Sequence, residues 1–185
     1  MKTILVCNQK GGVGKSLVAD EIAFSFERSG IPVSFYDLDA QGGTLHRTQE
    51  ADGAEVAVVD TPGALQEALS EWLREADVVV IPTRTTSRDI EPLMRMRKAV
   101  FKHSRAKIVY VMNGWNRFKA SRDFMEWFGG LAGDQTVVTL PQCEAFVQAG
   151  AAGVSVVQFD RRGKAARATR AMVDTVREAA GFPRE

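Results

Sequence analysis

Nine residues near the start of the chain have the types and spacing of a phosphate-binding loop. Between an apolar run at 3–7 and an amphipathic stretch from Leu17, the sequence reads Asn8-Gln9-Lys10-Gly11-Gly12-Val13-Gly14-Lys15-Ser16. Glycines let backbone N–H groups curl around an anion, and a helix start adds the positive end of its dipole. Lys15 would neutralise nucleotide phosphates, and the Ser16 hydroxyl suits Mg²⁺. The alternative is a glycine-rich turn with two solvated lysines.

The loop departs from the general pattern Gly-x-x-x-x-Gly-Lys-Ser at its first position. Gln9 occupies the place of the first glycine, and a second lysine, Lys10, follows it. A lysine at this point projects away from the phosphates that its own chain cradles. It could instead reach a phosphate held by a second copy of the protein, which would make nucleotide binding a property of a homodimer.

The elements that must position these residues alternate along the chain. Apolar runs predict strands at 3–7, 32–36, 55–59, 78–81, 108–112 and 136–140. Helical spacing of apolar residues predicts helices at 17–29, 65–73, 90–101, 124–128, 144–149 and 162–180. Pro92 is expected in the first turn of its helix, where proline is tolerated. Segment 154–159 is expected to be a last strand or an extended segment.

This alternation of strands and helices predicts an α/β fold, namely one doubly wound domain over residues 1–185 with a mostly parallel β-sheet flanked by helices. Strands that are apolar throughout, such as 78–81, indicate a sheet covered on both faces. Ligands of such sheets bind at the carboxyl ends of the strands. Asp39, Asp60, Thr83 and Asn113 all fall at or just after such ends, so we expect the functional site there.

The segment Lys-Gly-Gly-Val-Gly-Lys-Ser, residues 10–16, resembles the deviant Walker A loop of the ParA/MinD family of P-loop ATPases, whose fold is SIMIBI-like. Two further motifs resemble that family in the same order. Asp-x-Asp-x-Gln at 37–41 is similar to its Walker A-prime acid, although alanine stands at 40 where the family has proline. Asp-Thr-Pro-Gly at 60–63 is similar to its Walker B end.

The resemblance implies slow hydrolysis of ATP with Mg²⁺, in a sandwich dimer across which Lys10 contacts nucleotide. Lys10, Lys15 and Asp39 would be the catalytic residues, with Asp37 in support, and Ser16, Asp39 and Asp60 would hold the metal. A turn-forming aspartate is the alternative for Asp60. The implied nucleotide-binding residues are Lys10, Gly11, Gly12, Val13, Gly14, Lys15, Ser16, Leu17, Asn113, Pro141 and Gln142.

Asn113 occupies the place where the family has an asparagine that reads the adenine edge. A side-chain amide offers both a donor and an acceptor, as adenine requires, and the chain has no Asn-Lys-x-Asp motif for guanine. A turn residue at the end of a strand is an equally good interpretation. Pro141 and Gln142 are expected on the other side of the base.

The last helix combines an apolar face with a basic one. Alanines, Met172 and Val176 repeat on one side, and Arg167, Arg170 and Arg177 are expected on the opposite, exposed side. Cations also gather at its start, so the candidate DNA-binding residues are Arg161, Arg162, Lys164, Arg167 and Arg170. A solvated helix face is one interpretation. Sequence-independent binding to DNA phosphates is the other, favoured by the resemblance.

Composition sets limits on partners and location. The chain has 185 residues and a net charge of +1, so only a local patch would attract nucleic acid. Two cysteines and two histidines without metal spacing make a Cys/His metal site improbable. No apolar run could span a membrane, and no signal peptide is recognised. We expect a cytoplasmic protein, nucleoid-associated if it binds DNA, with no membrane partner.

The sequence leaves three functions open. The first is a ParA-like partition ATPase with a cognate ParB-like adaptor protein. The second is a P-loop transferase or ligase that uses ATP on a small molecule or a protein tyrosine. The third is a nucleotide-binding regulatory module that hydrolyses little, which the short connection at 42–55 favours, because the family keeps a switch region there.

Overall fold

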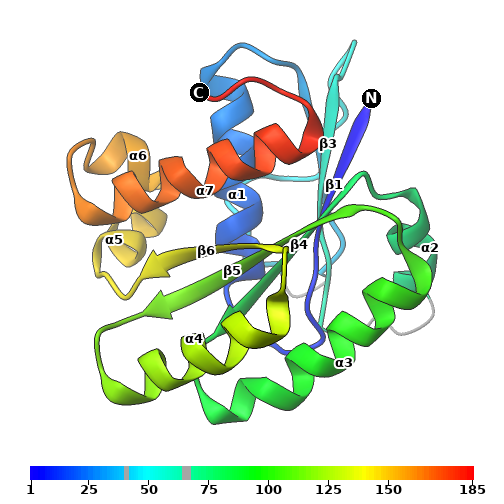
Figure 1. The fold of residues 1–185 in the computed structure, drawn as a ribbon. Helices are drawn as coiled ribbons and strands as arrows, with labels where there is room; N and C mark the ends of the chain where they lie inside the picture. Colours follow the sequence, from blue (N-terminus) through cyan, green and yellow to red (C-terminus); the bar gives the residue numbers. More distant parts are fainter. Residues whose placement is uncertain (40–41, 64–67) are drawn as a thin grey trace.

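A parallel sheet forms the middle layer of the protein (Figure 1). The structure, a computed structural model, describes residues 1–39, 42–63 and 68–185. Among these residues the sheet has six strands in the order β2-β3-β1-β4-β5-β6, and each neighbouring pair is parallel. The strands are β1 (Lys2–Val6), β2 (Val33–Asp37), β3 (Val56–Asp60), β4 (Val78–Arg84), β5 (Lys107–Trp115) and β6 (Thr136–Pro141). The predicted α/β fold is confirmed.

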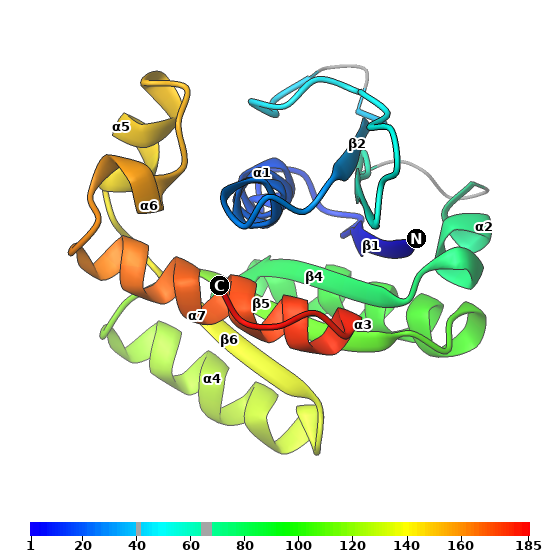
Figure 2. The same cartoon turned by 90° about the horizontal axis from the view of Figure 1, so that it is seen from above.

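Helices cover both faces of the sheet (Figures 1 and 2). In the described part of the chain they are α1 (Lys15–Arg28), α2 (Ala68–Glu75), α3 (Ser87–His103), α4 (Lys119–Ala132), α5 (Ala145–Ala151), α6 (Val156–Phe159) and α7 (Lys164–Ala180). Helices α1 and α7 pack on one face, and α2, α3 and α4 on the other. This arrangement explains why the central strands are apolar at every position.

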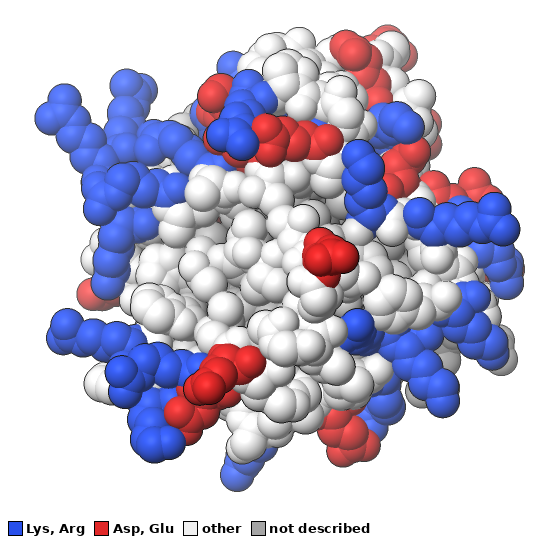
Figure 3. Space-filling model, in the orientation of Figure 1, with Lys and Arg blue, Asp and Glu red and all other residues white. Residues whose placement is uncertain are grey.

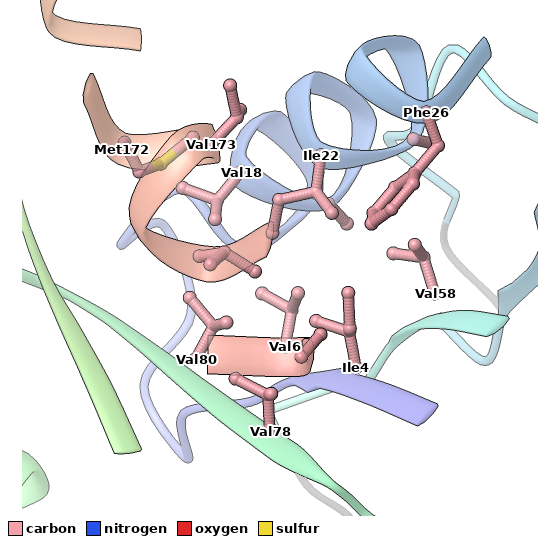
Figure 4. Close-up of a cluster of buried hydrophobic side chains, with 14 of the residues drawn as sticks. Ile4, Val6, Val18, Ile22, Phe26, Val58, Val78, Val80, Met172 and Val173 are labelled. Atoms are coloured by element: carbon pink, nitrogen blue, oxygen red, sulfur yellow. The ribbon is translucent and has the colours of Figure 1, made fainter. Parts of the chain in front are cut away.

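Alternate residues of β1 face opposite layers of the core. Ile4 and Val6 pack with Ile22 and Phe26 of α1 (Figure 4), whereas Leu5 joins the cluster beneath α2, α3 and α4. All five side chains are fully buried. Burial of such a side chain contributes about 1.5–3 kcal/mol, so both faces of β1 hold the strand that leads into the glycine loop.

The register of the sheet brings the acid-bearing strand ends to one level. Val6, the last residue of β1, is paired with Asp60, and Asp60 is paired with Asp37 on its other side. On the opposite side of β1, β4 and β5 end close together, with Arg84 paired with Asn113. The glycine loop therefore leaves the sheet between these ends, as predicted for a ligand site of a parallel sheet.

Segment 154–159 differs from the prediction of a strand or extended chain. It contains the one-turn helix α6, which begins with a capping box. The Ser155 hydroxyl accepts from the backbone N of Val157 at 3.1 Å, and the Gln158 side chain accepts from the backbone N of Ser155 at 3.3 Å. These bonds satisfy donors at the helix start, so the turn is stable despite its apolar, β-branched residues.

Helix α3 begins at Ser87, earlier than predicted, so Pro92 lies beyond the first turn where we expected it. Proline lacks the N–H that would bond to the carbonyl four residues earlier. The carbonyl of Arg88 is therefore without its usual helical donor, and the Lys10 ammonium donates to it at 3.3 Å. Helix α4 is also longer than the short helix that we predicted around 124–128.

Helix α7 presents the predicted apolar face, but the prediction for Arg177 is wrong. Arg177 is 1% exposed. Its guanidinium donates to the carbonyls of Ser25 and Pro183, each at 2.8 Å, and lies 4.8 Å from the ring centroid of Phe26. These acceptors and the aromatic face replace the water that a charged group loses on burial.

Some predicted features lie outside the described residues, namely Ala40 and Gln41 of the second motif and Leu65 of the helix predicted at 65–73. Both cysteines of the chain are free thiols. None of the described helices is long and apolar enough to cross a lipid bilayer.

Candidate nucleotide-binding site

The loop after β1 wraps around the N-terminus of α1. Gly12 and Gly14 have φ angles of 71° and 96°, in the left-handed region that favours glycine. Gly14 is the N-cap of α1 and has no side chain to bond to the helix, and the first turn contains no acidic residue. The first backbone N–H groups of α1 are therefore available to an anion, with the positive end of the helix dipole behind them.

The loop borders a cleft of about 620 Å³. Its lining brings the glycine loop together with the ends of the second and third strands, and consists of Gln9, Gly11, Gly12, Gly14, Lys15, Ser16, Leu17, Asp39, Gly42, Pro62 and Gly63. Lys15 is 7% exposed, and its Nζ lies 3.4 Å from the carbonyl of Lys10. The predicted phosphate lysine, hydroxyl and catalytic acid thus share one cleft.

Asp60 is fully buried at the end of β3, and neither carboxylate oxygen has a hydrogen-bond partner among the described residues. Burial raises the pKa of Asp60 from 3.8 to about 6, although the nearby Ser16 hydroxyl and Lys15 ammonium oppose this shift. A buried carboxylate without a partner is costly to keep charged. A cation held between Asp60 and Ser16 would remove that cost, so these two residues fit a magnesium site.

The described residues contain no group of three or more His, Cys, Asp or Glu side chains that could by themselves hold a metal ion. Mg²⁺ does not need such a group when phosphate oxygens and water complete its octahedral shell. The predicted set of Ser16, Asp39 and Asp60, two acids and one hydroxyl, suits an ion that binds together with nucleotide phosphates.

Asp37 organises the second acidic motif. One of its carboxylate oxygens accepts from the backbone N of Asp39 at 2.9 Å, and the other accepts from the Thr44 hydroxyl at 2.6 Å. Asp37 is therefore engaged within its own loop, whereas Asp39 lines the cleft. The backbone of Gly43 passes close to Ser16, because a Cβ on Gly43 would lie 3.4 Å from the Ser16 hydroxyl.

Lys10 is held by its own chain. Its Nζ lies 2.5 Å from Oδ1 of Asp89 and also bonds to the carbonyl of Arg88, both at the start of α3. The Asp89 side chain is 2% exposed and accepts a second hydrogen bond, from Thr86. Any contact between Lys10 and a second protomer must therefore replace this ion pair, in which Asp89 is a partner that the sequence analysis missed.

Asn113 supports the glycine loop. Its Nδ2 donates to the carbonyl of Val13 at 2.9 Å, and the residue is 8% exposed. A Cβ on Gly14 would lie 2.1 Å from that nitrogen, so Gly14 is needed for space as well as for its φ angle. One N–H of the amide is thus used within the protein, and adenine recognition by Asn113 stays a prediction.

Pro141 is the last residue of β6 and Gln142 follows it, and neither lines the cleft. The Gln142 side chain accepts from Nδ2 of Asn116 at 3.1 Å, and its backbone N donates to the carbonyl of Trp115 at 2.8 Å. Their predicted role beside the base is therefore untested. Asn116 is a further polar residue of this corner, and its proximity to Asn113 in the sequence could have suggested it.

Five cations surround the start of α7, and we name them the basic corner: Arg161, Arg162, Lys164, Arg167 and Arg170. Lys and Arg side chains gather at this edge of the molecule, over α6 and the beginning of α7 (Figure 3). Arg170 donates to the carbonyl of Arg161 at 2.9 Å, and Arg167 donates to that of Arg162. Within the described residues, none of the five takes part in a salt bridge.

A parallel α/β sheet whose first strand leads through a lysine-bearing glycine loop into a helix defines the P-loop class of nucleotide-binding proteins. Within that class, residues 4–156 match the family described as the CobQ/CobB/MinD/ParA nucleotide binding domain. The match covers most of the chain, and the protein belongs to this family.

Individual relatives are more distant. A protein named ParA from Rhizobium radiobacter is 27% identical over 115 residues, which are 48% of this chain and 51% of that protein. The chain spans about half or less of the length of the curated relatives that it matches.

Solved structures with the same fold cover nearly the whole chain. The ATP complex of a Cyanothece McdA variant has a TM-score of 0.82 at 15% identity, covering 100% of this chain and 98% of that one. The septum site-determining protein MinD of Pyrococcus horikoshii, complexed with Mg-ADP, has a TM-score of 0.73 at 17% identity, covering 97% of each chain. At these identities the similarity establishes the fold.

Proposed function

We propose that the protein is a ParA-like ATPase, which binds ATP with Mg²⁺, dimerises around it and hydrolyses it slowly. In this proposal the dimer binds DNA without sequence preference and serves the partition of a plasmid, a chromosome or another cargo through an adaptor protein. The observation that carries the proposal is the unpartnered, buried Asp60 beside Lys15 and Ser16 at the start of α1. Complexes of the structural neighbours with ATP or Mg-ADP support the choice of ligand.

Each residue of the cleft has a distinct task in this reaction. The N–H groups at the start of α1 and the Lys15 ammonium bind the phosphates and neutralise their charge. Asp39 orients the attacking water, and Asp37 fixes the backbone of Asp39. When bound, Mg²⁺ would supply additional positive charge at the phosphates, held by Ser16 and, through water, by Asp60.

Titration calorimetry with ATP and Mg²⁺ tests the binding step. We expect saturable binding in the parent protein and its loss in Lys15→Ala, because the buried ammonium lies in the cleft. Absence of heat and of any thermal stabilisation in the parent would refute the proposal. Binding without turnover above the Lys15→Ala background would instead select the weakly hydrolysing regulatory module.

Size-exclusion chromatography with ATP, with ADP and without nucleotide tests the dimer. The expected result is a dimer with ATP only, which Lys10→Ala abolishes. Lys98→Ala is the matched control, because Lys98 is an exposed lysine of α3. A monomer under all three conditions would argue against the ParA-like function while leaving nucleotide binding intact.

DNA binding by the basic corner has its own test. The affinity should require ATP and fall steeply with salt, and Arg167→Ala should lower the slope of log K against log salt by about one unit. Arg95→Ala is the control, since Arg95 is exposed but paired with Glu91 at 2.6 Å on α3. An unchanged slope in both variants would make the basic corner a solvated surface.

A further inference from the structure

A buried pair joins α1 to the loop that follows β2. The Asp20 carboxylate accepts from His46 twice, from ring Nδ1 at 2.7 Å and from the backbone N at 3.0 Å. It also accepts from the backbone N of Leu45 at 2.8 Å. Asp20 is 4% exposed and His46 is 8% exposed. Three donors from two consecutive residues of the loop thus converge on one carboxylate of the helix, and we name this pair the clasp.

The surroundings of His46 fix its ring. The ring lies between Phe24, at a centroid distance of 4.3 Å, and Phe35, at 5.0 Å. The charged groups that face it are Asp20 and Glu27, both from α1, and Nε2 lies 3.4 Å from the Glu27 carboxylate. Burial favours the neutral ring, but the two carboxylates outweigh it and raise the pKa of His46 above 6.5. Nδ1 donates to Asp20 in both protonation states, so the clasp persists above that pKa.

Thr44 links the clasp to Asp37 and Asp39, the acids at and just after the end of β2. The Thr44 hydroxyl lies 2.9 Å from the carbonyl of His46 and 2.6 Å from a carboxylate oxygen of Asp37. Asp37 in turn accepts from the backbone N of Asp39, which lines the cleft. The Thr44 hydroxyl has one proton for its two acceptors, so a continuous series of close polar contacts leads from Asp20 to the backbone of Asp39, the predicted catalytic acid.

Helix α1 is the common support of both parts of the site. Ser16 and Asp20 are four residues apart in α1, so they lie on the same face of the helix, one turn apart. The first turn of α1 faces the phosphates, and the second anchors the loop that carries the water-positioning acid. One rigid element thus sets the distance between the phosphate cradle and that acid.

We propose that Asp20 and His46 are positioning residues for phosphoryl transfer, which hold the loop at 42–46 against α1 so that Asp39 faces the bound phosphates. The inference rests on the proposed ATP hydrolysis and deepens it. It also assigns a task to the connection after β2, whose residues Leu45 and His46 are bonded to α1.

Steady-state kinetics of two variants separate positioning from simple stabilisation. His46→Phe keeps the ring between Phe24 and Phe35 but removes the Nδ1 donor, and His46→Asn restores a donor, because its amide nitrogen takes the place of Nδ1. We expect His46→Phe to lower kcat about tenfold while the Kd for Mg-ATP changes less than about twofold, and His46→Asn to recover most of kcat. Glu27→Gln, which changes the side chain 3.4 Å from Nε2 and leaves the Nδ1 donor in place, is the matched control and should leave kcat nearly unchanged.

Amide hydrogen exchange without nucleotide provides a readout independent of turnover. The backbone N–H groups of Leu45 and His46 should be protected in the parent and exchange at least about tenfold faster in Asp20→Asn, because they lose the carboxylate. An unchanged kcat in folded His46→Phe, a parallel loss of kcat and Mg-ATP affinity, or unchanged exchange in Asp20→Asn would each overturn the inference. A parent that binds no ATP or does not hydrolyse it refutes the proposed function instead, so the two failures are distinct.

Discussion

Two buried carboxylates, Asp60 and Asp89, lie on opposite sides of the glycine loop and differ in their partners. Asp60 has no hydrogen-bond partner in the described part of the chain, and burial raises its pKa to about 6. Asp89 is equally buried but accepts from the Lys10 ammonium and from Thr86. The charge of the first acid is not satisfied by the described residues, whereas the second holds a cation that the chain itself supplies.

One edge of a sheet can therefore contain both a candidate binding site, at Asp60, and a structural ion pair, between Lys10 and Asp89. Burial alone does not mark a functional acid, because Asp89 is 1% exposed and Asp60 is 0% exposed. What separates them is whether the surrounding residues satisfy the charge. Substitutions of Asp60 change one side of this comparison, and substitutions of Asp89 or Pro92 change the other.

The largest expected effect is on stability without Mg²⁺. The pKa of Asp60 is about 6 in the folded chain and 3.8 in the reference state, so between these values the folded state binds more protons and its stability falls as pH rises. A shift of two units corresponds to about 3 kcal/mol. Asp60→Asn should remove this loss of stability. Urea unfolding of parent and variant at pH 4 and pH 8 would measure the free energy of unfolding. Parallel pH profiles of parent and variant, with Asp134→Asn as an exposed control, would contradict the assignment.

The same substitution should have the opposite effect on function. In the proposed function Asp60 holds the metal through water, so Asp60→Asn, which removes its charge, should lower Mg²⁺-dependent ATP turnover about 10- to 100-fold. Metal titration in the turnover assay would show a higher Mg²⁺ requirement. Turnover equal to that of the parent at limiting Mg²⁺ would remove Asp60 from the metal site.

On the other side of the comparison, Asp89→Asn should weaken the ion pair that fixes the Lys10 side chain. Loss of a hydrogen bond between charged groups costs about 2 kcal/mol, reduced here because the Lys10 side chain is 32% exposed. Urea unfolding would measure the loss, and the ATP-dependent dimer should form at lower protein concentration, because Lys10 is released. A variant with parental stability and an unchanged dimerisation midpoint would show that the ion pair has no role.

The smallest effect is expected from Pro92→Ala. Alanine supplies the missing N–H to the carbonyl of Arg88, which then competes with the Lys10 ammonium at 3.3 Å. Removal of the proline ring should raise the overall free energy of unfolding. The interaction of the Lys10 ammonium with the Arg88 carbonyl should weaken by less than about 1 kcal/mol. The labelling rate of Lys10 by an amine-reactive reagent, relative to Lys98, would report this. A slower rate in the variant would contradict the competition.

The sequence revealed most of what is local and missed what depends on distant contacts. The glycine loop, the strands and the acid at the end of β3 were predictable, because each depends on residues adjacent in the chain. The Lys10–Asp89 pair joins residues 79 positions apart, and the clasp joins residues 26 apart, so no local pattern contains them. Only the sheet order brings such residues together.

Two predictions were wrong for different reasons, namely the exposed position of Arg177 and the strand or extended segment at 154–159. Helical periodicity placed Arg177 among exposed arginines, because no sequence rule anticipates that carbonyls of Ser25 and Pro183 surround its guanidinium. The error at 154–159 was avoidable. Ser155 and Gln158 form a capping box, and this local signal outweighs the β-branched residues between them.

The sheet order has a consequence for synthesis on the ribosome. Strand β1 pairs with β3 and β4, and the carbonyl of Val13 in the following loop accepts from Asn113. These contacts of β1 and its loop can form only after the later segments have been synthesised. A nascent chain that has emerged only to Leu38 carries the full glycine-lysine motif without the strands that shape it. Nucleotide affinity should therefore be gained late in translation, once β5 has left the exit tunnel.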